Sequence, residues 1–292
     1  MAISVRESAQ GFAAAVSGVD LREHLSVEDV AAIDKAIDRN AVVIFRHQTC
    51  SDEEQLAFAW RLGVPERSTD SMRNDRPQRL AHHQVMADIS NLNEKNEILA
   101  KDDWRRMFNL GNRLWHTDSS FRQIRGKHSM LSARAVPAAG GETEYADLRA
   151  AYDALPEAMK AQLEGLVAEH SLMYSRSTIG FADFSPEERA ALPPAHHAIV
   201  QVHPGSGRKT LYLASHASHI IGWPIPEARI LLRDLIEFAT QRQFVYRHQW
   251  QVGDFVIWDN RATMHRGRPF DEANQRRDLR RVTTQDLAAV PA

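Results

Sequence analysis

The sequence predicts a mainly β protein with helices: a β-sandwich or jelly roll decorated by α-helices. Short strand-like runs dominate the central and C-terminal parts of the 292 residues, and helical patterns concentrate near the start and in inserts. Because strands and helices do not alternate regularly, a doubly wound α/β fold is disfavoured. No repeat, low-complexity tract or Pro/Ser-rich linker divides the chain, so we expect a single domain over residues 1–292.

The composition narrows the possible partners and the compartment. The net charge of -2 gives no overall basic field that would hold nucleic acid or an anionic membrane. Cys50 is the one cysteine, which fits a reducing compartment, and the N-terminus lacks the apolar core of a signal peptide. No apolar run reaches the roughly 18 residues of a membrane helix. We therefore expect a cytoplasmic protein without nucleic-acid or membrane partners.

Near the N-terminus the sequence predicts a helix, a buried strand and a second helix. Ser26 is typical of an N-cap, and apolar residues recur at helical spacing over 27–39. The β-branched run at 41–45 indicates a strand. Ser51 and Glu54 match a capping box, which predicts the start of the next helix.

Two later segments differ from the strand-rich remainder. Residues 64–113 are polar and irregular, and because so long a connection is typically functional or mobile, we expect a substrate loop there. A helical insert is expected over about 147–192, with Pro156 at a helix start and Ser185 as an N-cap. Another helix is expected near 226–241. Strand-like runs occur at 128–137, 141–148, 198–203, 209–213, 244–250, 254–259 and 279–284.

The stretch LWHTDSSF places His116 and Asp118 two positions apart in a strand-like run. Side chains at i and i+2 of a strand leave the same face, so these two can share one metal ion. Since His-x-Asp alone is weak evidence, a third ligand is needed, and His265 is the best candidate. Two histidines and one carboxylate form the facial triad typical of non-haem Fe(II). A zinc hydrolase would more often show His-Glu-x-x-His or a third nitrogen ligand.

A ferrous site of this kind needs an anionic cosubstrate, which draws attention to two arginines. In QRRDLRRVTT, Arg277, Leu279 and Arg281 share one strand face. That face can present two guanidinium groups to a cavity, where a dicarboxylate would pair with them through bidentate hydrogen bonds. A solvated basic edge strand remains the alternative on this pattern alone.

Five segments resemble, in order and spacing, the taurine dioxygenase group of Fe(II)/2-oxoglutarate-dependent dioxygenases, and most closely its 2,4-dichlorophenoxyacetate dioxygenases. The resemblance extends from about residue 10 to 286 and includes LWHTDSSF, PAAGGETEYADLRAAYDALP, HPGSGRKTLYL, VGDFVIWDNRATMHRG and RRDLRRVTT. It implies a cupin-like double-stranded β-helix and a homo-oligomer. It also implies dependence on Fe(II), 2-oxoglutarate and O2, with ascorbate helpful in vitro.

The resemblance also implies residues for the metal and the cosubstrate. His116, Asp118 and His265 would bind Fe(II). Thr143 would hydrogen-bond a carboxylate of 2-oxoglutarate, and Arg277 would form a salt bridge to the distal carboxylate.

For the primary substrate, the resemblance implies a small organic anion. Arg281 would grip its anionic head, and Asn112 would be a polar residue on the substrate side. The implied reaction hydroxylates the carbon beside the ether oxygen of an aryloxyalkanoate such as 2,4-dichlorophenoxyacetate, and gives a phenol and glyoxylate with succinate and CO2. The alternative is the same chemistry on a taurine-like alkyl sulfonate, a sulfate ester or another small carboxylate. A non-catalytic jelly-roll binding protein and a zinc hydrolase also stay open.

Several other polar and aromatic residues need a prediction of their own. The segment 66–85 departs from the herbicide-degrading enzymes, in which a lysine is expected here, and offers arginines and histidines instead. Solvated positions are expected for most of its cations, which are Arg73, Arg76, Arg79, His82 and His83. Structural positions in turns or the core are expected for His203, His216, His219 and His248. Trp258 is expected to pack in the sandwich and to face away from the functional residues beside it.

Overall fold

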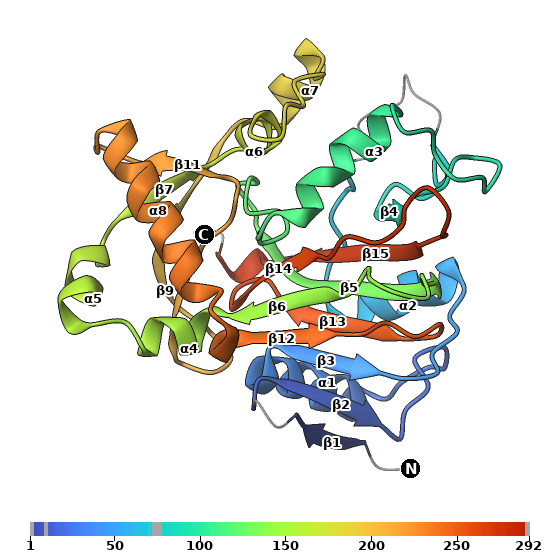
Figure 1. The fold of residues 1–292 in the computed structure, drawn as a ribbon. Helices are drawn as coiled ribbons and strands as arrows, with labels where there is room; N and C mark the ends of the chain where they lie inside the picture. Colours follow the sequence, from blue (N-terminus) through green and yellow to red (C-terminus); the bar gives the residue numbers. More distant parts are fainter. Residues whose placement is uncertain (1–2, 9–10, 70, 72–77, 290–292) are drawn as a thin grey trace.

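A seven-stranded sheet lies at the centre of the protein, in a computed structural model that describes residues 3–8, 11–69, 71 and 78–289 (Figure 1). Neighbouring strands are antiparallel, except that β2 runs parallel to β3. In spatial order the strands are β1 (Ser4–Glu7), β2 (Ala13–Ser17), β3 (Val42–Phe45), β13 (Phe255–Asp259), β5 (Gly126–Ala135), β15 (Asp278–Gln285) and β4 (Met86–Ser90).

Three smaller sheets complete the β structure. The sheet of β12 (Val245–His248), β6 (Thr143–Asp147) and β14 (Thr263–Gly267) packs on one face of the large sheet. A second sheet contains β11 (Ala217–Ile220), β7 (Val167–His170) and β8 (Ala195–Ala198), and a hairpin pairs β9 (Val200–Val202) with β10 (Lys209–Leu211). The predicted jelly roll with helices is confirmed.

Strand β13 shows why the central strands read as continuous apolar runs. Its side chains alternate between two buried layers. Phe255 and Ile257 pack in the layer beneath α1 (Val27–Asn40) and α2 (Asp52–Leu62), whereas Val256 and Trp258 pack in the layer that faces β6. Since both faces are covered, polar alternation is absent from this strand.

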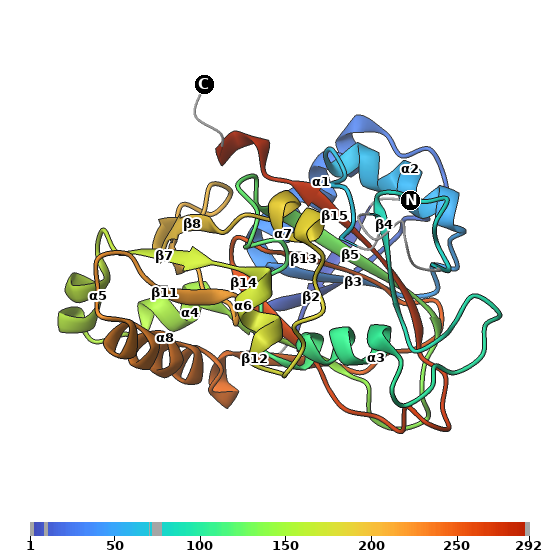
Figure 2. The same ribbon diagram turned by 90° about the horizontal axis from the view of Figure 1, so that it is seen from above.

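The two N-terminal helices begin where the sequence predicts. The hydroxyl of Ser26 accepts from the amide of Asp29 at 3.0 Å, and Ser51 forms a capping box with Glu54. Figure 2 shows α1 and α2 on one side of the large sheet and α3 (Trp104–Asn109) on the other. The α3 side is the one on which the candidate site lies.

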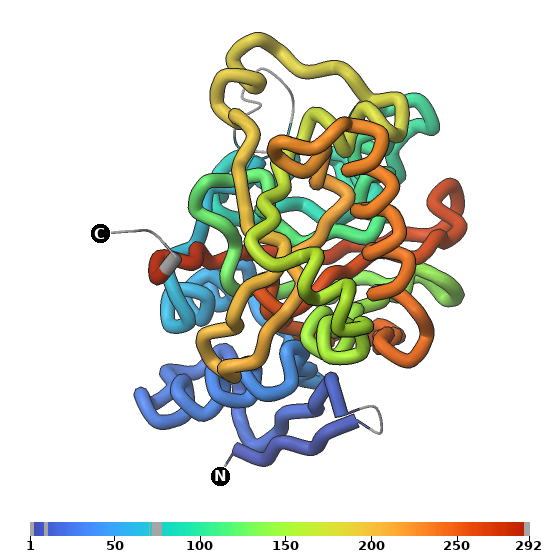
Figure 3. The backbone as a smooth tube through the Cα atoms, turned by 90° about the vertical axis from the view of Figure 1, so that its left-hand side faces the viewer, coloured from blue at the N-terminus to red at the C-terminus, as the bar shows by residue number. Residues whose placement is uncertain are grey.

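The two exceptional segments contain more structure than the sequence indicates. Segment 64–113 includes edge strand β4, α3 and a 3-10 turn, η2 (Leu110–Arg113). The expected helical insert also contains strand β7, beside α4 (Leu148–Asp153), α5 (Glu157–Leu163), α6 (Leu172–Ser177) and α7 (Pro186–Ala191). Helix α8 (Ile225–Ala239), the orange coil facing the viewer in Figure 3, packs against β11. The division of the chain into domains stays a prediction.

None of the helices in the described ranges combines the length and the apolar character needed to cross a membrane.

Phe255→Ala should lower the free energy of unfolding by about 3–5 kcal/mol, because it removes a fully buried aromatic ring. The ring makes edge contacts with Phe45 and Phe58 at centroid distances of 6.4 and 5.6 Å. Urea unfolding of the metal-free protein measures the loss. Val202→Ala, at an exposed position, is the control and should unfold like the parent. A Phe255→Ala protein as stable as the parent would contradict this account of the core.

Acid should destabilise the fold partly through His170, a fully buried histidine of β7. Burial, with the neighbouring His197, lowers its pKa to about 3. Below pH 6.5, His170 is therefore protonated in the unfolded chain but stays neutral in the folded protein. The free energy of unfolding falls as the pH drops from 6.5 towards 3. His170→Phe should flatten this dependence by up to about 1.4 kcal/mol per pH unit. Urea unfolding of the metal-free parent and variant at pH 7, 6 and 5 measures how the free energy of unfolding depends on pH. The two proteins would show the same dependence if His170 were protonated in the folded parent.

Candidate functional site

His116 and His265 are brought together by a single β-bridge. The amide of His116 donates to the carbonyl of His265 at 3.0 Å, and the amide of His265 donates back at 2.8 Å. The prediction that His116 and Asp118 lie along a strand is wrong, because the chain leaves the bridge at once and turns. Ser119, at φ 57, is part of this turn. The turn, rather than a strand face, directs the carboxylate of Asp118 at both imidazoles.

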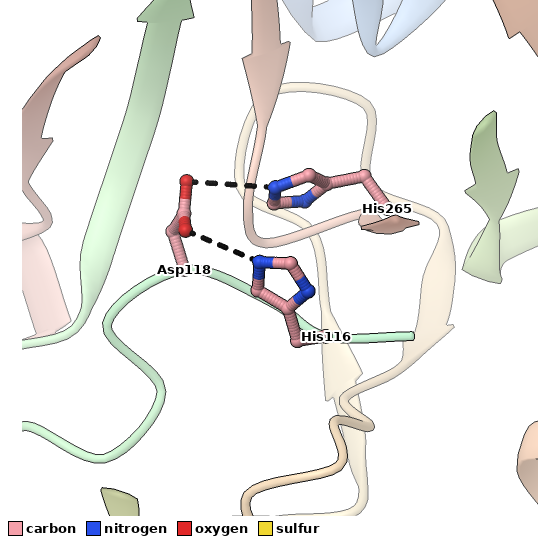
Figure 4. Close-up of side chains that lie close together, drawn as sticks. All are labelled: His116, Asp118 and His265. Carbon is pink, nitrogen blue, oxygen red and sulfur yellow. Dashed lines mark ion pairs between the residues drawn. The ribbon is translucent and has the colours of Figure 1, made fainter. Parts of the chain in front are cut away.

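The three side chains meet at one point (Figure 4). Nε2 of His116 lies 3.7 Å from Oδ1 of Asp118, and Nε2 of His265 lies 3.8 Å from Oδ2. All three residues are buried, and one donor atom of each lies within 4.8 Å of the others. A metal bound at roughly 2.0–2.2 Å from nitrogen and oxygen donors holds neighbouring donors about 3 Å apart. This group can therefore close on one cation with small side-chain movements.

Neighbouring groups orient the three donors. The carbonyl of Leu114 lies 2.8 Å from Nδ1 of His116, which leaves Nε2 directed at Asp118. The hydroxyl of Ser129 donates to Oδ2 of Asp118 at 2.8 Å, and the side-chain oxygen of Asn260 accepts from the Asp118 amide at 3.2 Å. Such supporting contacts hold ligands ready for a metal.

The protonation states also suit a metal ligand set. Burial lowers the pKa of His116, and burial together with His116 lowers the pKa of His265 well below its usual value. For Asp118, burial acts in the opposite direction, but Arg281 and the two histidines outweigh it and lower the pKa to about 2. At neutral pH the site therefore offers two neutral imidazoles and one carboxylate, the forms that bind metals.

Asp38, His203 and Asp259 form a second cluster with metal-ligand spacing. The guanidinium of Arg261 already neutralises these carboxylates, because its Nη2 lies 2.6 Å from Asp259 and 3.2 Å from Asp38. Nε2 of His203 donates to Oδ2 of Asp259 at 3.0 Å, which places His203 in the core as predicted. This cluster is an ion-pair network between α1, β13 and the β9–β10 hairpin.

A first cavity opens on the His265 side of the triad, lined among others by Leu131, Thr143, Trp258 and Arg277. Arg277 donates from Nε to the carbonyl of Gly141 at 3.3 Å, and it forms no ion pair with any carboxylate of the described residues. Desolvation lowers its pKa to about 10. A desolvated guanidinium is costly unless an anion pairs with it, so Arg277 is suited to bind an anionic ligand.

Two details of the first cavity complete its chemistry. The hydroxyl of Thr143 accepts from the indole nitrogen of Trp250 at 2.9 Å, which fixes its position at the start of β6. The sequence analysis expected Trp258 to face away from the functional residues, and this prediction is wrong. Its ring lies 4.6 Å from that of His265 and lines the cavity, because Trp258 belongs to the inward-facing set of β13.

A second cavity opens on the other side of His116 and Asp118. It shares Asn112, His116 and Arg281 with the first cavity, so these residues border both. Its apolar wall contains Phe108, Phe121 and Leu172, and its polar lining includes Glu66, Arg176 and His216.

The structure brings all the predicted site residues around these two cavities. Arg281 donates from Nη1 to Oδ1 of Asp118 at 2.6 Å, and Asn112 lies on η2. Sequence reasoning missed the lining roles of Glu66 and Arg176, and it expected only a structural place for His216. Those three come from separate segments with no motif, so only tertiary contact reveals them.

Segment 66–85 lies partly within the described residues. Arg73 and Arg76 lie outside them. Arg79 is not solvated, because its Nη2 lies 2.7 Å from Asp278 and its Nε lies 3.4 Å from Asp88. His82 is exposed, as expected of a loop residue.

Comparison with known proteins finds a family and several relatives that are similar to this chain over most of its length. The family described as "Taurine catabolism dioxygenase TauD, TfdA family" matches residues 4–283. The alpha-ketoglutarate-dependent 2,4-dichlorophenoxyacetate dioxygenase of Cupriavidus pinatubonensis is 47% identical over 279 residues, 96% of each chain. The (S)-phenoxypropionate/alpha-ketoglutarate-dioxygenase of Sphingobium herbicidovorans is 36% identical over 91% of this chain and 89% of its own. A crystal structure of AAD-2 in complex with Mn(II) and N-oxalylglycine matches with a TM-score of 0.89 and 46% identity over 98% of both chains.

Proposed function

We propose, from the premise that this chain belongs to the TauD, TfdA family of dioxygenases, that it is an Fe(II)- and 2-oxoglutarate-dependent dioxygenase acting on an aryloxyalkanoate. The product of hydroxylation beside the ether oxygen is a hemiacetal, which separates into a phenol and glyoxylate. The observation that carries the proposal is Arg277, a guanidinium without a carboxylate partner among the described residues, in a cavity that also contains His265.

His116, Asp118 and His265 are the proposed Fe(II) ligands. Their burial, spacing and protonation states support this role. Bound Fe(II), together with 2-oxoglutarate and O2, supplies the oxidising power that places one oxygen atom in a substrate C–H bond and releases succinate and CO2.

The first cavity is the proposed 2-oxoglutarate site. Arg277 binds the distal carboxylate, and the Thr143 hydroxyl adds a hydrogen bond. N-oxalylglycine is an analogue of 2-oxoglutarate, and its presence with Mn(II) in the similar AAD-2 structure supports a cosubstrate site of this kind. Trp258 and Leu131 give this pocket an apolar lining, and an ion pair is stronger in apolar surroundings than in water.

The second cavity is the proposed site of the primary substrate. Arg281 and Asn112 are positioned for the acidic head, beside the metal ligands. The apolar wall of Phe108, Phe121 and Leu172 suits an aryl group. Anchoring the head holds the neighbouring methylene at a fixed distance from the triad, which is catalysis by positioning.

An oxygen-electrode screen with Fe(II), ascorbate and 2-oxoglutarate tests this function. We expect 2,4-dichlorophenoxyacetate to accelerate O2 consumption with matched release of succinate, phenol and glyoxylate, and taurine or an alkyl sulfate ester to give less. Stimulation by the sulfonate or sulfate alone would shift the substrate to the alternative class. Absence of any 2-oxoglutarate-dependent O2 uptake would favour a binding protein, and anaerobic activity with Zn²⁺ would favour a hydrolase.

The remaining predictions concern the setting of the enzyme. A small-molecule substrate agrees with the relatives. A homo-oligomer, a cytoplasmic location and the lack of nucleic-acid and membrane partners stay predictions.

A further inference from the structure

Arg176 on α6 is a second arginine in the lining of the second cavity. Its side chain is buried, with a residue exposure of 6%, and its guanidinium carbon lies 4.4 Å from the ring centroid of Phe108. Nη1 also lies 3.4 Å from the hydroxyl of Ser175, a weak contact. Arg281 borders both cavities, whereas Arg176 borders the second cavity and not the first.

Gly111 provides the space that this guanidinium occupies. A Cβ atom at Gly111 would lie 2.2 Å from Nη1 and 2.4 Å from Cζ of Arg176. The backbone at Gly111 does not have a positive φ, so room rather than conformation explains the glycine. Because Gly111 precedes Asn112, the contact also places Arg176 beside a residue already assigned to the substrate side.

Arg281 cannot give all its donors to a substrate. Its Nη1 is bonded to Oδ1 of Asp118 at 2.6 Å, and Asp118 is a proposed metal ligand. A carboxylate offers about four acceptor positions on its two oxygens. Arg176 adds a second fixed guanidinium charge to the lining of the same cavity.

We propose that Arg176 binds the acidic head of the primary substrate together with Arg281, and that Gly111 is small so that Arg176 can reach it. The inference rests on the proposed function, because it assumes an anionic substrate in the second cavity. Arg176 would then set the preference of the enzyme for acids over neutral compounds of the same shape.

Anaerobic calorimetry on protein loaded with Fe(II) and 2-oxoglutarate tests this role. The probes are 2,4-dichlorophenoxyacetate and its neutral methyl ester. Arg176→Met should weaken binding of the acid by about 10- to 100-fold, the effect of losing one charge-assisted hydrogen bond, and change binding of the ester by less than about threefold. Gly111→Ala should act in the same direction, because it displaces the guanidinium without removing it. Affinity for 2-oxoglutarate itself should be unchanged in both variants.

A double variant and a control separate binding from folding. Arg176→Met/Gly111→Ala should bind the acid no more weakly than Arg176→Met alone, since both changes remove one interaction. Arg189→Met, which removes an exposed arginine near Phe184, should behave as the parent. Equal losses for acid and ester, or additive losses in the double variant, would overturn the inference in favour of a packing role. If the parent binds 2-oxoglutarate but neither probe, the aryloxyalkanoate assignment fails, and this inference fails with it.

Discussion

His265→Ala should abolish 2-oxoglutarate-coupled turnover and lower metal affinity by more than about 100-fold, since losing even a supporting partner of a ligand typically costs 10- to 100-fold. The substitution leaves one imidazole and one carboxylate, too few protein donors for a facial triad. The backbone bridge between His265 and His116 uses main-chain atoms and survives the change. The fold should therefore persist while the site fails.

Metal content after dialysis against Fe(II) under anaerobic conditions is the direct measurement, with O2 uptake as the second. His196→Ala is the matched control, because His196 is exposed and lines neither cavity. The control should retain metal and activity. A His265→Ala protein that still holds one equivalent of iron would show that the triad is not the metal centre.

Local sequence signals predicted the elements whose cause is local. The caps at Ser26 and Ser51 satisfy helix ends through hydrogen bonds within three residues, so they can be read directly from the chain. Strand β13 is apolar along its length because both of its faces are covered. The fold class followed from such elements.

Other features depend on contacts between distant segments. Strand β4 has a short sequence of mixed polarity, MADIS, and it forms a strand by pairing with β15. The turn at Asp118 is set by Asn260 and Ser129, which lie more than ten residues away in sequence. No periodicity marks either feature.

Some residues of the candidate site could be predicted from local sequence, and others depend on contacts between distant segments. His116, Asp118 and His265 were predicted from residue type and spacing, because metal binding restricts the chemistry of its ligands. Arg176 lies in a short helix of the insert and has no motif. Its packing against Gly111 and Phe108, which come from another segment, places it in the second cavity.

Arg277→Met should weaken binding of 2-oxoglutarate by about 10- to 100-fold, because it removes charge-assisted hydrogen bonds worth roughly 1.5–3 kcal/mol from a desolvated site. In the parent this guanidinium has no carboxylate partner among the described residues, so the cosubstrate supplies the missing charge. Methionine keeps most of the side-chain volume. Anaerobic calorimetry with Fe(II)-loaded protein measures the change, and Arg276→Met, at the exposed neighbouring position, should leave binding as in the parent.

A shorter 2-oxoacid shows whether the lost contact is the distal carboxylate. 2-Oxobutyrate keeps the keto acid end that chelates a metal but lacks the second carboxylate, so Arg277→Met should not alter its binding. In the variant, the affinities for 2-oxoglutarate and 2-oxobutyrate should therefore converge. If both ligands instead weaken by the same factor, Arg277 shapes the cavity without touching the distal carboxylate, and the cosubstrate lies elsewhere around the triad.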